Sequence, residues 1–240
     1  MNLEQLGWSA YGADLNPTDL SQGYTFGRVA CALRDRTFIL TPTGNYWATL
    51  TGNFRYHAQS PADFPVVGDW VTVDENAQIT TLLPRKSQLS RQAAGKVTQE
   101  QLLAANIDTV FILCGLDHDF NLRRIERYLV TIWESGANPV ILLNKADLCE
   151  AIGQVQAEVE NIALGVPIYA LSAAYNTGIE KLLPYLNQGQ TVALLGFSGV
   201  GKSTLTNQLL GDNRQAVQTV RTDDSRGRHT TTQRELFPHW

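Results

Sequence analysis

The stretch "VALLGFSGVGKST" (Val192–Thr204) carries the strongest indication of a fold in this chain. An apolar run leads into a glycine-rich loop, and a helix-forming run follows it. Gly196 to Ser203 fit the pattern G-x-x-x-x-G-K-[ST], in which backbone N–H groups wrap phosphates at the positive end of the following helix. The stretch therefore predicts a buried strand, a phosphate-binding loop and a helix, which together open a nucleotide-binding α/β unit.

Two side chains of this loop carry predicted chemistry. Lys202 is expected to reach the β- and γ-phosphates and to stabilise charge during catalysis, and the Ser203 hydroxyl is expected to ligate Mg²⁺. The predicted phosphate site consists of Gly196, Phe197, Ser198, Gly199, Val200, Gly201, Lys202, Ser203 and Thr204.

A second motif, "ILLNKAD", predicts which base is bound. It supplies Asn144, Lys145, Ala146 and Asp147 just beyond an apolar run. A carboxylate at Asp147 can accept two hydrogen bonds from guanine, whereas adenine lacks that pair of donors. Such polar pairing discriminates by roughly 10⁴-fold or more. The motif favours a GTP site over the rival interpretation, a P-loop ATPase or kinase.

The third motif lies in "IYALSAAYNTG", where Ser172 and Ala173 stand at the position from which a backbone N–H meets the guanine oxygen. In the usual GTPase order the phosphate loop comes first, but here Asn144 and Ser172 precede Gly196. A sheet is specified by which strands are neighbours, so a fold cut at one loop and rejoined at its old termini keeps its site. The order predicts a circularly permuted GTPase unit, with the join near "YLNQGQTVALL".

The pattern of apolar residues changes near residue 90, which divides the chain into two regions. From Tyr24 to Leu83 short β-rich runs, among them "YTFGRVACAL", "TFILTP", "NYWATLTGNFRYHA" and "VVGDWVTV", predict a small OB-like or SH3-like barrel. Later, apolar runs alternate with amphipathic ones, which predicts a parallel sheet covered on both faces. We therefore expect an extension over 1–20, an OB-like barrel over 21–90 and a permuted GTPase domain over 91–240.

The barrel is a candidate RNA surface, because aromatic rings that stack on bases and arginines that meet phosphates are how OB-folds hold RNA. The alternative is that the strand aromatics form the barrel core, so only a subset is expected to face outward. The aromatic candidates are Tyr24, Phe26, Tyr46, Trp47, Phe54, Tyr56 and Trp70. The basic candidates are Arg28, Arg34, Arg36, Arg55, Arg85, Lys86 and Arg91.

Composition restricts the compartment and the partners. The net charge of −4 predicts no general attraction to nucleic acid, so any RNA contact must be local. Cys31, Cys114 and Cys149 are isolated, which argues against a disulfide scaffold or a zinc site in these residues. We expect neither a signal peptide nor a membrane-spanning segment, because the first residues lack a basic and then apolar pattern and no apolar run reaches the length of a span. We expect a cytoplasmic monomer with no membrane or DNA partner.

On these motifs, together with "VVGDWV" and "VRTDDSRGRHTTTQRELF", the chain resembles the circularly permuted GTPases of the RsgA family, which act in small ribosomal subunit biogenesis. The resemblance covers nearly everything after Gly23. It implies an OB-fold that binds rRNA, late maturation work on the small (30S) subunit, and hydrolysis of GTP to GDP and phosphate stimulated by that subunit. It also implies His229 as the residue that positions the attacking water.

The run "GRHTTT" (Gly227–Thr232) is typical of a switch loop that orders around a γ-phosphate and Mg²⁺. One of Thr230, Thr231 and Thr232 would supply the hydroxyl to Mg²⁺, with Thr231 slightly favoured. Asp224 to Gly227 also fit D-x-x-G, but no long apolar strand precedes them, so we reject them as the γ-phosphate sensor.

The family pattern continues beyond "ELFPHW" through a strand into Asp-x-Pro-Gly and then a zinc-bearing helical domain, whose ligands are not among these 240 residues. We therefore expect a chain incomplete at its C-terminal end, with base and phosphate binding retained and hydrolysis weakened. The alternative function is a guanine-nucleotide-dependent RNA-binding module with little hydrolysis.

Overall fold

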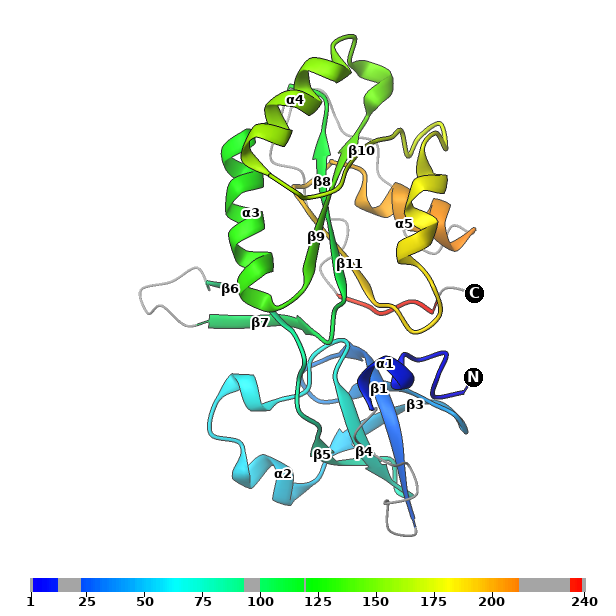
Figure 1. The fold of residues 1–240 in the computed structure, drawn as a ribbon. Coiled ribbons are helices and arrows are strands. Elements are labelled where there is room, and N and C mark those ends of the chain that lie inside the picture. Colours follow the sequence, from blue (N-terminus) through cyan, green and yellow to red (C-terminus); the bar gives the residue numbers. More distant parts are fainter. Residues whose placement is uncertain (1, 13–22, 93–99, 119, 212–233, 239–240) are drawn as a thin grey trace. The chain divides into compact units, whose positions relative to one another are not determined.

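The computed structural model describes residues 2–12, 23–92, 100–118, 120–211 and 234–238 (Figure 1). Its described residues form two compact units. The first takes those within Met1–Asp108, Gln188–Thr191 and Gln233–Pro238, and the second takes those within Thr109–Asn187 and Val192–Thr232. Each unit is described by itself.

The first unit contains a closed five-stranded barrel with the order β1-β2-β3-β5-β4. Its strands are β1 (Tyr24–Ala32), β2 (Thr37–Thr41), β3 (Gly44–Leu50), β4 (Trp70–Asp74) and β5 (Gln78–Leu82). All neighbours are antiparallel except β3 and β5, whose parallel pairing closes the barrel. The interior is an apolar cluster of Val29, Ile39, Ala48, Val71, Val73 and Ile79. The predicted OB-like barrel is confirmed.

One predicted strand run is partly wrong. The stretch "NYWATLTGNFRYHA" is a strand only as far as Leu50, and a helix, α2 (Gly52–His57), follows it. Thr51 caps this helix, because its side-chain oxygen accepts a hydrogen bond from the Phe54 backbone N–H at 3.1 Å. Phe54 and Tyr56 therefore belong to a helix. A short 3₁₀ helix, η2 (Pro61–Asp63), lies between α2 and β4.

The N-terminal residues pack on the barrel through aromatic rings. The Trp8 ring in α1 (Trp8–Tyr11) lies 4.3 Å from the Phe26 ring and 4.8 Å from the Trp70 ring, centroid to centroid. Tyr11 stacks on Trp70 at 5.6 Å, and its hydroxyl donates to the Pro84 carbonyl at 2.5 Å. These rings extend the apolar core of the barrel with residues that precede its first strand.

Arg28 joins β1 to four other segments of the same unit. Its guanidinium donates to the carbonyls of Leu6 and Gly68, to the carbonyl of Asn106 at 3.0 Å and to the Thr191 hydroxyl at 2.7 Å. The side chain is buried, and burial lowers the pKa of Arg28 to about 10, although nearby carboxylates raise it. Its four partners satisfy the donors that burial removes from water.

A two-stranded antiparallel ribbon completes the first unit. It consists of β6 (Gln88–Gln92) and β7 (Glu100–Ala105). Asn106 and Asp108, which follow β7, lie in the first unit, and the parallel-sheet unit begins at Thr109.

The second unit is built on a four-stranded parallel sheet with the order β10-β9-β8-β11. Its strands are β8 (Thr109–Gly115), β9 (Asn138–Asn144), β10 (Ile168–Ala170) and β11 (Val192–Gly196). Its α-helices are α3 (Leu122–Ser135), α4 (Ile152–Ile162) and α5 (Lys202–Leu210), and its 3₁₀ helices are η3 (Ala146–Leu148) and η4 (Ile179–Tyr185). In Figure 1, α3 and α4 lie on one face of this sheet and α5 lies on the other. The predicted α/β unit is confirmed.

The sheet order also confirms the permuted connectivity. β11, which leads into the phosphate loop, comes last of the four strands in the chain yet pairs with β8, the first. β8 is buried along almost its whole length, and its Phe111 and Leu113 pack with Leu205 of α5, in a cluster that also holds Val200. Strand pairing places the late motif beside the early ones.

Candidate nucleotide site

The predicted site residues gather at the carboxyl edge of the parallel sheet. Asn144 ends β9 opposite Gly115, which ends β8, and Gly196 ends β11 opposite Leu113. Ser172 follows β10 after one further residue. In open parallel sheets this edge is where ligands bind, since the loops that leave the strands converge there.

The phosphate loop has a backbone that requires glycine at two positions. Gly199 and Gly201 have φ values of 77° and 98°, in the left-handed region that other residues rarely adopt. A Cβ at Gly201 would lie 2.4 Å from Asn144 Nδ2, and one at Gly196 would lie 2.6 Å from the Leu113 carbonyl oxygen. The loop can therefore approach the sheet edge only because these residues lack side chains.

Asn144 joins all three predicted motifs. Its Nδ2 donates to the Val200 carbonyl in the phosphate loop at 2.8 Å, and its Oδ1 accepts from the Ala173 backbone N–H at 2.9 Å. The side chain is only 2% exposed. An amide has one donor end and one acceptor end, so Asn fits a position that must bridge a carbonyl and an N–H.

Asp147 is held by the segment that carries the third motif. The Ser172 hydroxyl donates to Asp147 Oδ1 at 2.5 Å. Asp147 itself is exposed, in the first turn of η3. A carboxylate oriented in this way keeps its other oxygen available to a base.

Lys145 makes an ion pair that the sequence interpretation missed. Its Nζ lies 2.6 Å from Asp117 Oδ2, and the exposed fractions of the two side chains are 26% and 16%. Lys145 also adopts a left-handed backbone, with φ of 62°. Asp117 lies two residues beyond the end of β8, and Lys145 directly follows β9, the neighbouring strand. This matching position at the same sheet edge is the signal by which the sequence could have identified Asp117 as the partner of Lys145.

The Lys202 side chain makes hydrogen bonds to carbonyl groups of the phosphate loop. Its Nζ donates to the Gly196 carbonyl at 2.9 Å and to the Phe197 carbonyl at 2.7 Å, and burial lowers its pKa. A bound anion would counteract the cost of burying this charge. The Arg124 guanidinium, also missed by the sequence interpretation, lies 4.5 Å from the Phe197 ring centroid and covers the half-exposed ring.

Not every predicted residue can be placed. Ser203 and Thr204 lie in the first turn of α5, directly after Lys202. His229 and the threonines Thr230, Thr231 and Thr232, as well as Asp224 to Gly227, lie outside the described residues. Among the residues that the structure describes, no three His, Cys, Asp or Glu side chains are grouped to hold a metal ion, and none of the helices has the length and apolar character needed to cross a membrane.

Comparison with known proteins identifies the relatives of the chain. Residues 82–239 match the family model described as RsgA GTPase. A protein of Lactiplantibacillus plantarum named small ribosomal subunit biogenesis GTPase RsgA 2 is 46% identical over 234 residues, which cover 96% of this chain and 65% of the relative. A Xylella fastidiosa protein named small ribosomal subunit biogenesis GTPase RsgA is 52% identical over 179 residues, covering 74% of this chain and 54% of that protein. The chain thus spans about two thirds or less of the length of these two relatives.

Two solved structures have the same fold. The crystal structure of YjeQ from Thermotoga maritima superposes with a TM-score of 0.62 at 26% identity, over 77% of this chain and 64% of that one. The structure of YloQ, titled a circularly permuted GTPase, gives a TM-score of 0.57 at 21% identity, over 80% of this chain and 66% of that one.

Proposed function

Because the chain belongs to the RsgA GTPase family, we propose that its parallel-sheet unit binds GTP with Mg²⁺ and hydrolyses it to GDP and phosphate, in the service of small ribosomal subunit maturation. The observation that carries this proposal is the position of Asn144, which hydrogen-bonds the phosphate loop on one side and the Ser172–Ala173 segment on the other. One buried amide thus ties the expected phosphate site to the expected base site.

The residues of the site have separate tasks in this proposal. Asp147 accepts hydrogen bonds from the guanine ring N–H and exocyclic amine, while the Lys145 stem lies along the base plane. Lys202 exchanges its two loop carbonyls for phosphate oxygens and, with the loop N–H groups, stabilises charge on the transferring phosphoryl group. His229 orients the attacking water.

The site also fits Mg²⁺, which neutralises developing phosphate charge when bound. Mg²⁺ usually takes only one or two protein ligands and completes its shell with phosphate oxygens and water. Ser203, next to Lys202 in the first turn of α5, supplies one hydroxyl, and a switch threonine, Thr231 in our preferred assignment, supplies another.

We propose that the barrel contacts rRNA of the small subunit through a limited outward surface. Trp47 is 41% exposed, and the Arg36 guanidinium lies over its ring at 4.5 Å. This pair offers a stacking plane beside a cation, the combination suited to single-stranded RNA. By contrast, Trp70, Phe26 and Arg28 are buried and unavailable.

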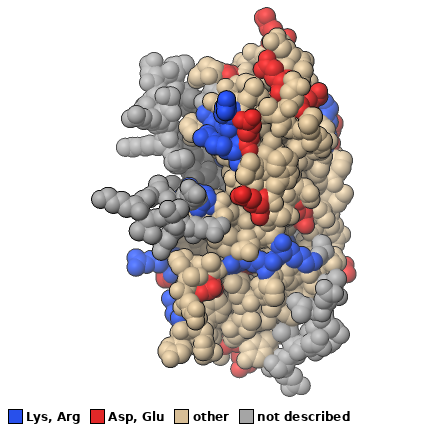
Figure 2. Space-filling view, turned by 60° about the vertical axis from the view of Figure 1, so that its left-hand side comes forward, with Lys and Arg blue, Asp and Glu red and all other residues tan. Residues whose placement is uncertain are grey.

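The charge distribution agrees with a local contact. On the face drawn in Figure 2, Lys and Arg side chains occur in separate groups, with Asp and Glu side chains elsewhere on the same face. The described cysteines, Cys31, Cys114 and Cys149, are unpaired, which suits a reducing cytoplasm. We propose a cytoplasmic monomer.

The nucleotide proposal is tested by competition and by a base-specificity change. GTP and GDP, but not ATP, should displace a fluorescent guanine nucleotide from the chain. Asp147→Asn should weaken GDP binding by about 100-fold or more and favour xanthosine diphosphate, because the amide can donate to the extra oxygen of xanthine. The control is Glu150→Gln, an exposed carboxylate three positions away, which should change neither affinity.

Two results would contradict this assignment. Unchanged GDP affinity in Asp147→Asn would remove the residue from the base site, and equal displacement by ATP would favour the P-loop ATPase. If guanine nucleotides bind but no phosphate is released with or without small subunits, the chain acts as a guanine-nucleotide-dependent binding module instead.

The RNA proposal is tested with a pair of exposed tryptophans. Trp47→Leu should weaken binding of the chain to small subunits or their rRNA by about fivefold or more, the cost of one stacked base. Trp133→Leu removes a ring that is 53% exposed on α3 and should leave that binding unchanged. Equal effects of the two changes would rule out the barrel surface as the contact.

A further inference from the structure

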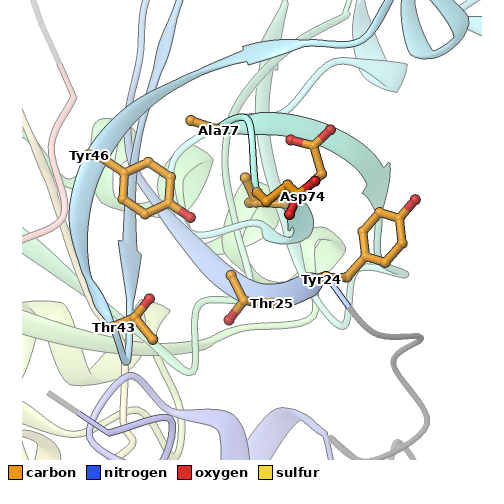
Figure 3. A pocket seen from close by; sticks show the side chains of 9 residues that line it. Tyr24, Thr25, Thr43, Tyr46, Asp74 and Ala77 are labelled. Atoms are coloured by element: carbon orange, nitrogen blue, oxygen red, sulfur yellow. The ribbon is translucent and has the colours of Figure 1, made fainter.

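One end of the barrel holds a pocket that the nucleotide proposal does not use. It has a volume of about 360 Å³ and lies where β1 begins, β4 ends and the β2–β3 and β4–β5 turns meet (Figure 3). It is lined by Gly23, Tyr24, Thr25, Thr43, Tyr46, Val73, Asp74, Glu75 and Ala77. Mouths of β-barrels are frequent ligand sites, and this volume lies at the small end of their range, suited to a ligand as small as a single side chain.

The pocket has a carboxylate fixed between two tyrosines. Asp74 is the direct cross-strand partner of Tyr24, and in the view of Figure 3 it lies between Tyr24 and Tyr46. Asp74 Oδ1 accepts from the backbone N–H groups of Asn76 at 3.0 Å and Gln78 at 2.8 Å. Its Oδ2 has no hydrogen-bond partner among the described residues. The turn therefore orients the carboxylate and leaves one oxygen for a ligand.

The charges of the lining residues select the ligand. Asp74 and Glu75 are acidic, and the nine lining residues include no Lys, Arg or His. Two carboxylates repel phosphate, so a nucleotide or an RNA backbone is disfavoured in this pocket. A cation gains both the Coulomb attraction and a charge-assisted hydrogen bond to Asp74.

The two tyrosines favour a planar cation. Tyr24 is 43% exposed, and Tyr46 is half-buried with its ring packed against the barrel interior. Burial, with a contribution from the Asp74 charge, raises the pKa of Tyr46, so its hydroxyl stays neutral at physiological pH. Guanidinium stacks on aromatic faces and pairs with a carboxylate through parallel N–H groups, which the compact ammonium of lysine does less well.

We propose that this pocket binds an arginine side chain presented by a basic protein segment, with Asp74 as the counter-ion and Tyr24 and Tyr46 as the aromatic walls. The inference goes beyond the proposed function, because it concerns a protein ligand of the barrel and needs no guanine nucleotide. Free polyamines and RNA are the competing occupants, and the experiment separates them.

The test uses the full 240-residue chain, labelled with ¹⁵N, and follows the backbone amides of Tyr24, Asp74 and Ala77. N-acetyl-arginine amide should shift these resonances with a Kd on the order of 1 mM, as expected of one ion pair plus one stacked ring. N-acetyl-citrulline amide has the same shape without the charge and should bind at least tenfold more weakly. Spermidine and a uridine hexanucleotide are the other two probes.

Variants locate the site. Asp74→Asn keeps the Oδ1 acceptor for the turn but removes the charge, and should weaken arginine binding about tenfold. Tyr24→Leu removes an exposed ring, keeps the fold, and should weaken binding about threefold. Asp35→Asn, an exposed carboxylate in the β1–β2 turn, is the control and should change nothing.

Three outcomes would overturn the proposal. In the first, the citrulline derivative binds as tightly as the arginine derivative. In the second, spermidine or the oligonucleotide shifts these amide resonances at a lower concentration than the arginine derivative does. In the third, neither Asp74→Asn nor Tyr24→Leu changes the affinity for the arginine derivative. Because Tyr24→Leu alters only an exposed ring, it remains informative if Asp74→Asn disturbs the turn.

Discussion

Lys145 Nζ lies 2.6 Å from Asp117 Oδ2, so the lysine expected to cover the guanine plane is held by a carboxylate from the neighbouring strand end. Both side chains are partly buried. The pair fixes the lysine stem before any base arrives, which reduces the entropy that ordering it would cost on binding.

We predict that Asp117→Asn weakens GDP binding about two- to fivefold, the range expected when a partly exposed ion pair is lost. The effect should appear in the nucleotide Kd while the melting temperature of the unbound chain changes little. Glu134→Gln, an exposed carboxylate on α3, is the control. A variant that melts earlier but binds GDP normally would make Asp117 purely structural.

Gly201→Ala should disable the phosphate loop. The new methyl would stand 2.4 Å from Asn144 Nδ2, at a backbone φ of 98° that alanine adopts only at a cost of about 1–2 kcal/mol. Either Asn144 loses its bridge or the loop moves, so guanine-nucleotide affinity should fall by more than about tenfold, measured by nucleotide titration.

The matched control is Gly153→Ala in α4, where the added methyl meets nothing within 4 Å. This change should leave the guanine-nucleotide affinity unchanged and should raise the free energy of unfolding by at most about 1 kcal/mol. Normal nucleotide binding by Gly201→Ala would show that the close approach of Gly201 to Asn144 is not needed.

Arg28→Met should destabilise the barrel unit by about 2–4 kcal/mol in denaturant unfolding. The change leaves the carbonyls of Leu6 and Asn106 buried without their donor, and each such loss costs about 1–3 kcal/mol. The control is Arg34→Met, which replaces an exposed arginine in the β1–β2 turn and should change the free energy of unfolding by no more than about 0.5 kcal/mol. Equal stability of the two variants would mean that the Arg28 hydrogen bonds contribute nothing net.

Trp8→Ala should lower the free energy of unfolding of the same unit by about 3 kcal/mol, because it removes a ring packed between Phe26 and Trp70. Tyr56→Ala provides the comparison, since that ring is 84% exposed and its loss should cost less than about 0.5 kcal/mol. If deleting residues 2–12 left the unfolding curve unchanged, the N-terminal segment would not belong to the barrel core.

The elements whose signals are local could be predicted from the sequence. The phosphate loop and β9 with its Asn-Lys-x-Asp motif appear where their residues indicated, and α3 is one of the amphipathic runs expected between the strands. Each depends on backbone or capping requirements met by neighbouring residues, such as the left-handed φ of 83° at Gly136. The boundary of β3 failed for the same kind of reason, because the Thr51 cap was not recognised and β-rich composition hid α2.

Other features depend on pairings between distant residues. The presence of a phosphate loop and a guanine motif, and their permuted order, can be read from consecutive residues. The folded chain, by contrast, brings Asp117 to Lys145, lets Asn144 bridge Val200 and Ala173, and buries Arg28. Strand pairing and barrel closure choose such partners, and no local pattern encodes which side chain will lie across the sheet edge.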